Sequence, residues 1–245
     1  HLFHKAENFN GELSNWNTMR ATNMGSMFRE ANNFNGNLSK WNVARVTGMG
    51  QAFHWAKKFN GDLSKWNVVR VMDMGYMFRG AGRFNTDVSK WDVSRATNMK
   101  EIFSMAQGFN GDLSKWNVSS AETMEGAFFQ VMQFNGDLSK WDTSRVTNMH
   151  GVFSMWPIER SVSKFNGDLS KWNTSNVVSM EKTFMFAKYF SRDISKWDVG
   201  KVTTLKETFD GAEAFNSDIS KWQTANVQLL SSTFSRAYAF NGNLN

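Results

Sequence analysis

A repeat of about 25 residues governs the whole sequence, and a period of this length is typical of chains that stack one small structural unit many times. One tryptophan marks the repeat at a constant spacing, which is interrupted only by a longer interval between Trp141 and Trp172. The copies of this tryptophan are Trp16, Trp41, Trp66, Trp91, Trp116, Trp141, Trp172, Trp197 and Trp222. The string FNGDLSKWN is identical at 59–67, 109–117 and 165–173. The chain is therefore expected to form a stack of similar units.

Each copy contains two different hydrophobic patterns. After the Asn-Gly turn signal at 60–61, polar and apolar side chains alternate over residues 65–68, which predicts a short strand. The apolar positions of the other half are Met24, Met27, Phe28 and Ala31 in the first copy. This spacing is that of one helical face, and Thr22 or Asn23 could cap the helix. Each unit is therefore predicted to be a strand, a turn, a helix and a return loop.

A single unit is too small to bury its own rings, so neighbouring units must cover them. In an in-register stack the strands would form a parallel sheet, and each ring would pack on its counterparts in the next units. The fold class predicted from the residues is an α/β solenoid, with a parallel β-sheet on one face, short helices on the other, and about nine to ten repeats.

The composition agrees with one repeat array over residues 1–245. The chain has 41% apolar and 20% charged residues, with 22 Phe and 11 Trp, so we expect a soluble domain with an aromatic core. No apolar segment is long enough to span a membrane. Neither end has a polar capping segment, so we expect a piece of a longer protein, or self-association through uncapped ends.

The repeat resembles that of the BspA-like surface proteins. The likeness rests on the pattern W-[ND]-[VT]-S-x-V-T-N-M-x-x-M-F-x-x-A-x-x-F-N, seen at 141–153 and, for its tail, at 91–110. The departures are Gln223, Leu205, Leu230 and one insertion of six residues. The resemblance implies leucine-rich-repeat-like arrays of about this period, found in bacterial surface proteins, mycoplasma lipoproteins and unicellular algae. It also implies a role in adhesion or at the cell surface.

A column of lysines is the first candidate binding site. Lysine precedes the repeat tryptophan in eight copies, which places a row of ammonium groups on the predicted sheet face. The candidate residues are Lys65, Lys90, Lys115, Lys140, Lys171 and Lys196. The simpler interpretation is a solvated ladder, compensated by aspartates three residues earlier. The alternative is a stripe that binds anionic partners such as acidic glycans or an acidic protein face, in line with the net charge of +6.

The insertion at 154–164 is the second candidate site. Eleven residues separate Phe153 from Phe165, where other copies have five, and they include the only proline of the chain. The candidate residues are Trp156, Pro157 and Arg160. Insertions in repeat arrays often map to binding surfaces, although a loop extension is also tolerated at little entropic cost.

The other site classes have weak support. Four scattered histidines, no cysteine and no nucleophile or phosphate-loop motif argue against an enzyme, a metal site or a cofactor. Calcium at the Asn-Gly-Asp loops is disfavoured, because six to eight oxygens are needed and these side chains are expected to close their own turns. Nucleic acid is an unlikely partner, since the rings occupy core positions.

These observations predict a non-enzymatic interaction, adhesion or structural module, with other proteins or acidic glycans as partners. We expect it at a cell surface or outside the cell. The alternative is a scaffold subunit inside an intracellular assembly. A glycan-degrading enzyme is a weaker rival, because it would need paired carboxylates in a cleft that a regular array does not offer.

Overall fold

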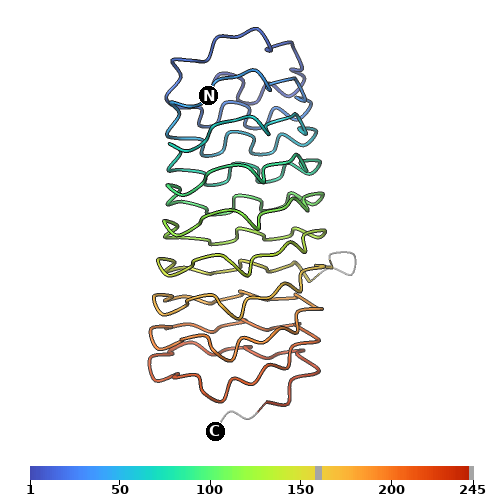
Figure 1. The fold of residues 1–245 in the computed structure, drawn as a ribbon. Coiled ribbons are helices and arrows are strands. Elements are labelled where there is room, and N and C mark those ends of the chain that lie inside the picture. The colour runs from blue at the N-terminus through green and yellow to red at the C-terminus, as the bar shows by residue number, and fades with distance from the viewer. Residues whose placement is uncertain (158–161, 243–245) are drawn as a thin grey trace.

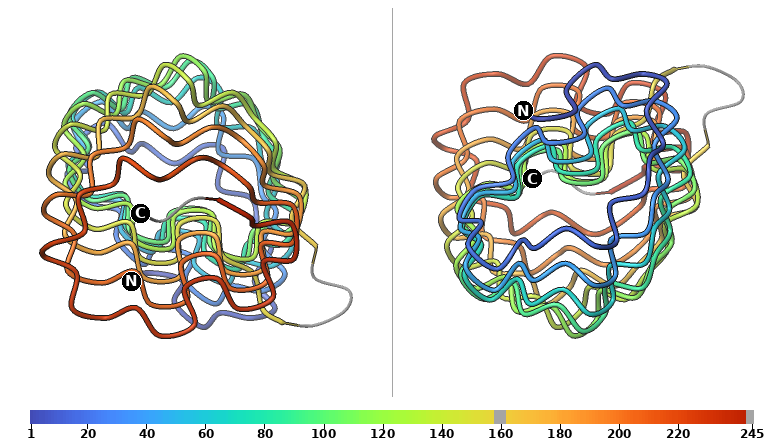
Figure 2. Two further views of the ribbon diagram at one scale, coloured as in Figure 1. Left: turned by 90° about the horizontal axis from the view of Figure 1, so that it is seen from below. Right: turned by 90° about the horizontal axis from the view of Figure 1, so that it is seen from above.

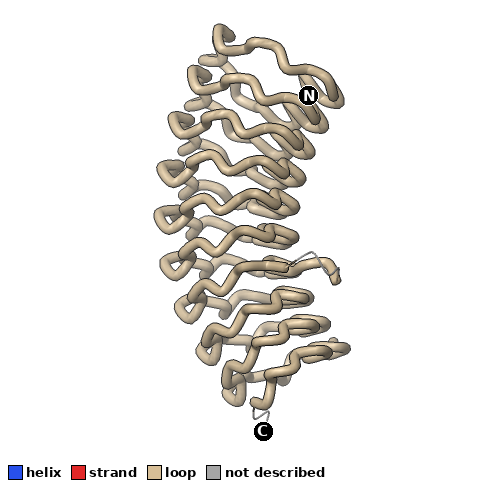
Figure 3. Tube along the Cα trace, turned by 90° about the vertical axis from the view of Figure 1, so that its right-hand side faces the viewer, coloured by secondary structure: helices blue, strands red, loops and turns tan. Residues whose placement is uncertain are grey.

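The chain winds into a stack of coils, and each copy of the repeat forms one coil. The computed structural model describes residues 1–157 and 162–242. Figure 1 shows the coils following one another from the N-terminal to the C-terminal end of the stack. Viewed along the stack, successive coils lie over one another (Figure 2), and the side view shows a gentle curve (Figure 3). The repeat period is thus the length of one coil.

The described residues contain no helix, and no strand longer than a single bridging residue. The predicted α/β solenoid, with a parallel sheet and short helices as in leucine-rich repeats, is therefore wrong. The regular pairing that exists is one parallel bridge between neighbouring coils. The bridged residues are, in order, Asn23, Gly48, Asp73, Asn98, Thr123, Asn148, Ser179, Thr204 and Leu229.

The segment predicted as a helix is a series of overlapping tight turns. In residues 74–81, the amide of Met77 donates to the carbonyl of Met74 at 3.1 Å, which closes a turn within the coil. The amide of Tyr76 instead donates to the carbonyl of Lys100 in the next coil, at 2.7 Å. Turns and bonds to the next coil alternate along the segment. A helix would direct all these amides to carbonyls four residues back.

Left-handed backbone conformations exclude a helix here. Tyr76 has a φ of 58°, and Gly80 has a φ of 71°. For a residue other than glycine this conformation costs roughly 1–2 kcal/mol, and it cannot continue a right-handed helix. The position of Tyr76 is left-handed in every copy of the repeat, at Ser26, Gln51, Tyr76, Glu101, Gly126, Gly151, Lys182, Glu207 and Ser232. The hydrogen bonds to the next coil offset this cost.

The predicted strand is interrupted by two further turns. The amide of Trp66 donates to the carbonyl of Leu63 at 3.0 Å, and the amide of Val71 donates to that of Val68 at 2.8 Å. Buried and exposed side chains do alternate between these turns. The bends prevent neighbouring coils from forming a continuous ladder, so no sheet results.

Columns of aromatic rings fill the interior. The ring of Phe53 stacks between Phe28 and Phe78, with centroid distances of 5.5 and 5.6 Å. The repeat tryptophans form a second column, in which the indole Nε1 donates to a carbonyl of the preceding coil, as Trp91 does to Leu63 at 3.0 Å. A buried indole N–H needs such an acceptor, so this bond fixes the register of neighbouring coils.

A column of asparagines links the coils at the surface. The amide of Asn85 donates to Oδ1 of Asn60 at 2.8 Å, and the amide of Asn60 donates to Oδ1 of Asn35 at the same distance. The prediction that these asparagines close their own turns is therefore wrong, because each accepts from the next coil. The aspartates do close their turns: Oδ1 of Asp62 accepts the amide of Ser64 at 2.9 Å.

Candidate functional site

The lysine column lies on a tight turn and not on a sheet face. Lys65, for example, lies in the turn between Leu63 and Trp66. The six candidate lysines, Lys65, Lys90, Lys115, Lys140, Lys171 and Lys196, are all exposed. Their predicted position on a sheet is wrong because these coils form no sheet. Their recurrence along one edge of the stack follows from the repeat itself.

The aspartates of the same turns are held mainly by serines. Backbone and side-chain hydrogen bonds from Ser114 lower the pKa of Asp112, and the charge of Lys115 adds to this effect. Among the residues that the structure describes, none of the six candidate lysines lies within 4.0 Å of a carboxylate oxygen as an ion pair. The column therefore presents ammonium groups at a surface where the carboxylates already have hydrogen-bond partners.

The insertion takes Trp156 out of the core. Trp156 occupies the sequence position that is alanine in most copies, such as Ala106, which is fully buried. An indole does not fit that space, and the side chain of Trp156 is 44% exposed. Pro157 is exposed as well, whereas Arg160 lies outside the described residues.

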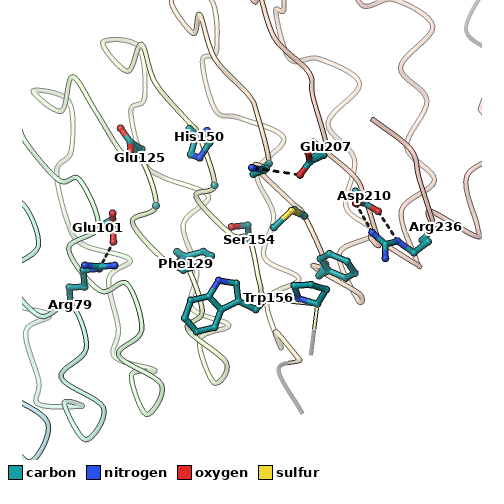
Figure 4. A pocket seen from close by; sticks show the side chains of 16 residues that line it. Arg79, Glu101, Glu125, Phe129, His150, Ser154, Trp156, Glu207, Asp210 and Arg236 are labelled. Atoms are coloured by element: carbon teal, nitrogen blue, oxygen red, sulfur yellow. Dashed lines mark hydrogen bonds and ion pairs between the residues drawn. The ribbon is translucent and has the colours of Figure 1, made fainter. Parts of the chain in front are cut away.

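A hollow with a volume of about 550 Å³ lies beside Trp156 (Figure 4). We call it the Trp156 hollow. Its lining comes from consecutive coils and consists of Arg79, Glu101, Glu125, Gly126, Phe129, His150, Gly151, Ser154, Trp156, Pro157, Lys182, Met185, Phe186, Glu207, Asp210 and Arg236. Most of these residues belong to the series of turns that the sequence predicted as helices. The volume is within the range of small-molecule sites.

Two glycines line the Trp156 hollow. Gly126 and Gly151 stand in the left-handed column, where the coils on either side carry Glu101 and Lys182. Both glycines have left-handed φ angles, of 59° and 60°. A Cβ at Gly126 would approach Cγ of Glu101 to 2.8 Å. The side chain of Glu101 thus takes the space over Gly126, whereas a Cβ at Gly151 would meet only Oγ of Ser154, at 3.2 Å. The opening therefore lies at Gly151, next to the basic neighbour Lys182.

Ion pairs between coils line the Trp156 hollow. Nη2 of Arg236 lies 2.7 Å from Oδ2 of Asp210, and Nζ of Lys182 lies 3.7 Å from Oε2 of Glu207. Hydrogen bonding to Asp210 raises the pKa of Arg236. On the opposite side, Arg79 contacts Glu101 through Nε and Oε2, without the alignment of a hydrogen bond. Both signs of charge therefore face the same space.

Glu125 completes the set of paired carboxylates. It contacts Nζ of Lys100 at 2.9 Å and accepts a hydrogen bond from Asn148 at 3.2 Å. The hydrogen bond to Glu125 is also the main cause of the raised pKa of Lys100. All four carboxylates that line the hollow thus have a cationic partner.

Aromatic rings form the remaining side. The ring of Trp156 meets Phe129 edge to face, with a centroid distance of 5.5 Å and an angle of 85°. Phe186 lies under the guanidinium of Arg236, whose Cζ is 4.6 Å from the ring centroid. The Trp156 hollow therefore combines hydrogen-bonding groups with an exposed indole, which is the usual composition of a ligand site.

A second hollow, of about 730 Å³, reaches the lysine column. It lies between the coils near Asp193 and Asp218, and Lys196 and Lys221 are among its lining residues. Trp197, which also lines it, belongs to the buried tryptophan column. Ser191 and Ser217, which also line it, stand where most copies have asparagine and glycine, whereas the aspartates and lysines follow the repeat pattern.

The sequence pointed to Trp156 and Pro157 but not to the rest of the hollow. The two glycines could have been found by comparing the nine copies, because Gly126 and Gly151 are the only glycines in their column. The charged residues could not be placed, since a helix in their segment would have set them on a different surface.

Metal-binding clusters and membrane-spanning helices are two further features that the described residues lack. In residues 1–157 and 162–242, no group of three or more His, Cys, Asp or Glu side chains is arranged to hold a metal ion. The same residues include no helix of the length and apolar character needed to cross a membrane.

Comparison with known proteins identifies a family. The family model described as "Mycoplasma protein of unknown function, DUF285" matches residues 1–85, 58–159 and 154–245. Neither a curated protein nor a solved structure gives a significant match. Because the three matched segments together extend over all 245 residues, the chain belongs to the DUF285 family of Mycoplasma repeat proteins.

Proposed function

We propose that this chain is a non-enzymatic interaction module whose partner binds in the Trp156 hollow. One observation carries the proposal: two departures from the repeat, the insertion and the pair of glycines, lie side by side at this hollow. The insertion exposes Trp156, and Gly126 and Gly151 remove side chains from the surface next to it. A local combination of an exposed aromatic ring and a cavity is typical of binding sites.

The surroundings of the carboxylates support binding rather than catalysis. A general acid needs an environment that keeps its carboxyl group protonated. Asp210 and Glu207 instead lie beside Arg236 and Lys182. The four carboxylates of the hollow contribute to ion pairs between coils, so a structural role already accounts for them.

A cell-surface location is part of the same proposal. Its support is the resemblance of the repeat to that of BspA-like surface proteins, together with membership of a Mycoplasma repeat family. The stack suits such a role because each coil packs on its neighbours and the outer columns remain available to partners. The proposed partners are other proteins or glycans.

The test compares Trp156→Ala with Tyr189→Ala on an array of immobilised proteins and glycans. Tyr189 is a matched control because it is an aromatic residue, 59% exposed, that does not line the hollow. The wild-type chain is expected to bind a restricted set of spots. Trp156→Ala should weaken that binding about tenfold or more, because exposed aromatic anchors often dominate an interface. Tyr189→Ala should leave it unchanged.

The proposal fails if all retained spots bind wild type and Trp156→Ala equally. It also fails if the array retains nothing. Circular dichroism of each variant should show an unchanged fold, because Trp156 is outside the aromatic columns.

A further inference from the structure

The charges of the Trp156 hollow are balanced. Arg79 with Glu101, Lys182 with Glu207, and Arg236 with Asp210 form three pairs across neighbouring coils. The remaining carboxylate, Glu125, is paired with Lys100. An ionic ligand would therefore gain little net Coulomb attraction and would have to compete with an existing partner. A neutral ligand can use the free lone pairs and N–H groups of the same pairs, and hydrogen bonds to charged groups are the stronger kind.

The backbone at the base of the hollow offers no pairing edge. The amide of Gly126 donates to the carbonyl of His150 at 2.8 Å, and the amide of Gly151 donates to that of Glu181 at 2.9 Å. The amide of Met155 likewise donates to the carbonyl of Met185, at 2.8 Å. A peptide that binds by adding a strand needs unpaired backbone groups along an edge. These amides are already used by the next coil, so this mode of peptide binding is disfavoured.

The indole of Trp156 supplies an apolar platform. Its contact with Phe129 is edge to face, at 85°, and the side chain is still 44% exposed. The contact with Phe129 orients the ring without covering both of its faces. A flat apolar surface beside charged hydrogen-bonding groups is suited to a molecule that has one C–H face and a rim of hydroxyl groups.

We propose that the Trp156 hollow binds a neutral oligosaccharide. One sugar ring would stack on Trp156. Hydroxyls of the neighbouring rings, which extend along the stack, would donate to carboxylates such as Glu101 and Glu207 and accept from Arg79 or Lys182. This assignment rests on the proposed function, because it names the ligand class of the same site. This ligand class differs from the acidic glycans expected for the lysine column. A neutral ligand is favoured here because the charged side chains of the hollow are already paired.

The experiment fills the hollow without changing the backbone. In Gly151→Gln the new side chain stands in a column where Gln51 already adopts a left-handed φ of 60°. The nearest atom to the new Cβ would be Oγ of Ser154 at 3.2 Å, a hydroxyl that can rotate away. Ser232→Gln is the matched control, because Ser232 is exposed, has a φ of 56° in the same column and does not line the hollow.

Calorimetric titration with a panel of neutral oligosaccharides, and with sulfated counterparts, gives the readout. At least one neutral sugar is expected to bind the wild-type chain, with an affinity that hardly changes between low and high salt. Gly151→Gln and Trp156→Ala should each weaken that binding about tenfold, which corresponds to about 1.4 kcal/mol. Ser232→Gln should bind as wild type does.

Three results would overturn the assignment. These are no binding of any neutral sugar, binding that Gly151→Gln leaves unaltered, and a preference for the sulfated sugars that high salt abolishes. The protein array separates the two proposals. If Trp156-dependent binding is found only at protein spots, the sugar assignment is wrong while the proposed interaction function stands.

Discussion

At the scale of single residues, His54 is a buried histidine in a cationic environment. It is 8% exposed, and Nη1 of Arg79 lies 3.5 Å from its Nε2. Burial, followed by the charges of Arg79 and Arg29, lowers the pKa of His54 to about 4, and Glu30 opposes this only in part. The folded chain therefore holds His54 neutral at a pH where the unfolded chain binds a proton.

This pKa shift predicts a loss of stability in mild acid. Between about pH 6.5 and the folded-state pKa of about 4, the unfolded chain binds more protons at His54, so the free energy of unfolding falls as the pH falls. In His54→Gln this contribution is absent, and the midpoint of thermal unfolding should decline less over the same range. Melting curves of the wild-type chain and of His54→Gln at a series of pH values check this prediction. Parallel pH profiles for the two proteins would contradict the prediction.

The aspartates of the turns act in a different pH range. Hydrogen bonds from serines lower the pKa of Asp62 and its counterparts, so their contribution is present above the unfolded pKa of about 3.9 and is lost below it. This second loss is common to wild type and His54→Gln. It provides an internal reference for the histidine effect.

At the scale of elements, the sequence predicted which side chains face inward but not the backbone that carries them. Met74, Met77, Phe78 and Ala81 are all buried, as the helical spacing required. A series of tight turns places side chains inward at an interval similar to that of a helix, so hydrophobic periodicity alone does not distinguish the turns from a helix. The difference lies in the amides that bond to the next coil, because their acceptors lie almost a full repeat away in the sequence. Local propensity does not report such distant partners.

The close packing of Gly80 gives a test of this backbone. A Cβ at Gly80 would lie 2.5 Å from the ring of Trp55, and its φ is 71°. Gly80→Ala should therefore destabilise the chain by about 1–3 kcal/mol, the usual cost of overpacking. Gly82→Ala is the control, because no atom lies within 4 Å of its added Cβ.

Chemical denaturation of both variants provides the measurement. If a regular helix occupied residues 74–81, alanine at position 80 would stabilise it instead. The combined change Trp55→Ala with Gly80→Ala should recover part of the loss by removing the overlapping ring. A stabilised Gly80→Ala chain would refute the turn structure at this position.

At the scale of the whole molecule, stacking converts each repeated residue into a row. The lysine column is the clearest chemical case, because Lys115, Lys140 and Lys171 lie at the same corner of successive coils and are exposed. Rows of one charge attract polyanions through the summed field, and the effect is screened by salt. The sequence sufficed to predict this row, since its basis is the period and does not depend on the type of backbone.

Charge reversal tests whether the row acts as a unit. The triple variant Lys115→Glu, Lys140→Glu and Lys171→Glu should elute from a heparin column at lower salt than the wild-type chain. The control is Lys58→Glu, Arg83→Glu and Lys164→Glu, which changes the net charge equally at exposed positions outside the column. Equal shifts of the two triple variants would mean that net charge alone governs the binding.

The insertion after Phe153 leaves the coils around it in register. The amide of Asn166 still donates to Oδ1 of Asn135 at 2.9 Å, and Trp172 stacks on Trp141 at 6.1 Å with an angle of 4°. Extra chain at this corner is therefore absorbed locally, at the small entropic cost of a longer loop. The stack can thus serve as a display frame: segments of other lengths and compositions could be grafted at the same corner of any coil, while the frame below them stays the same.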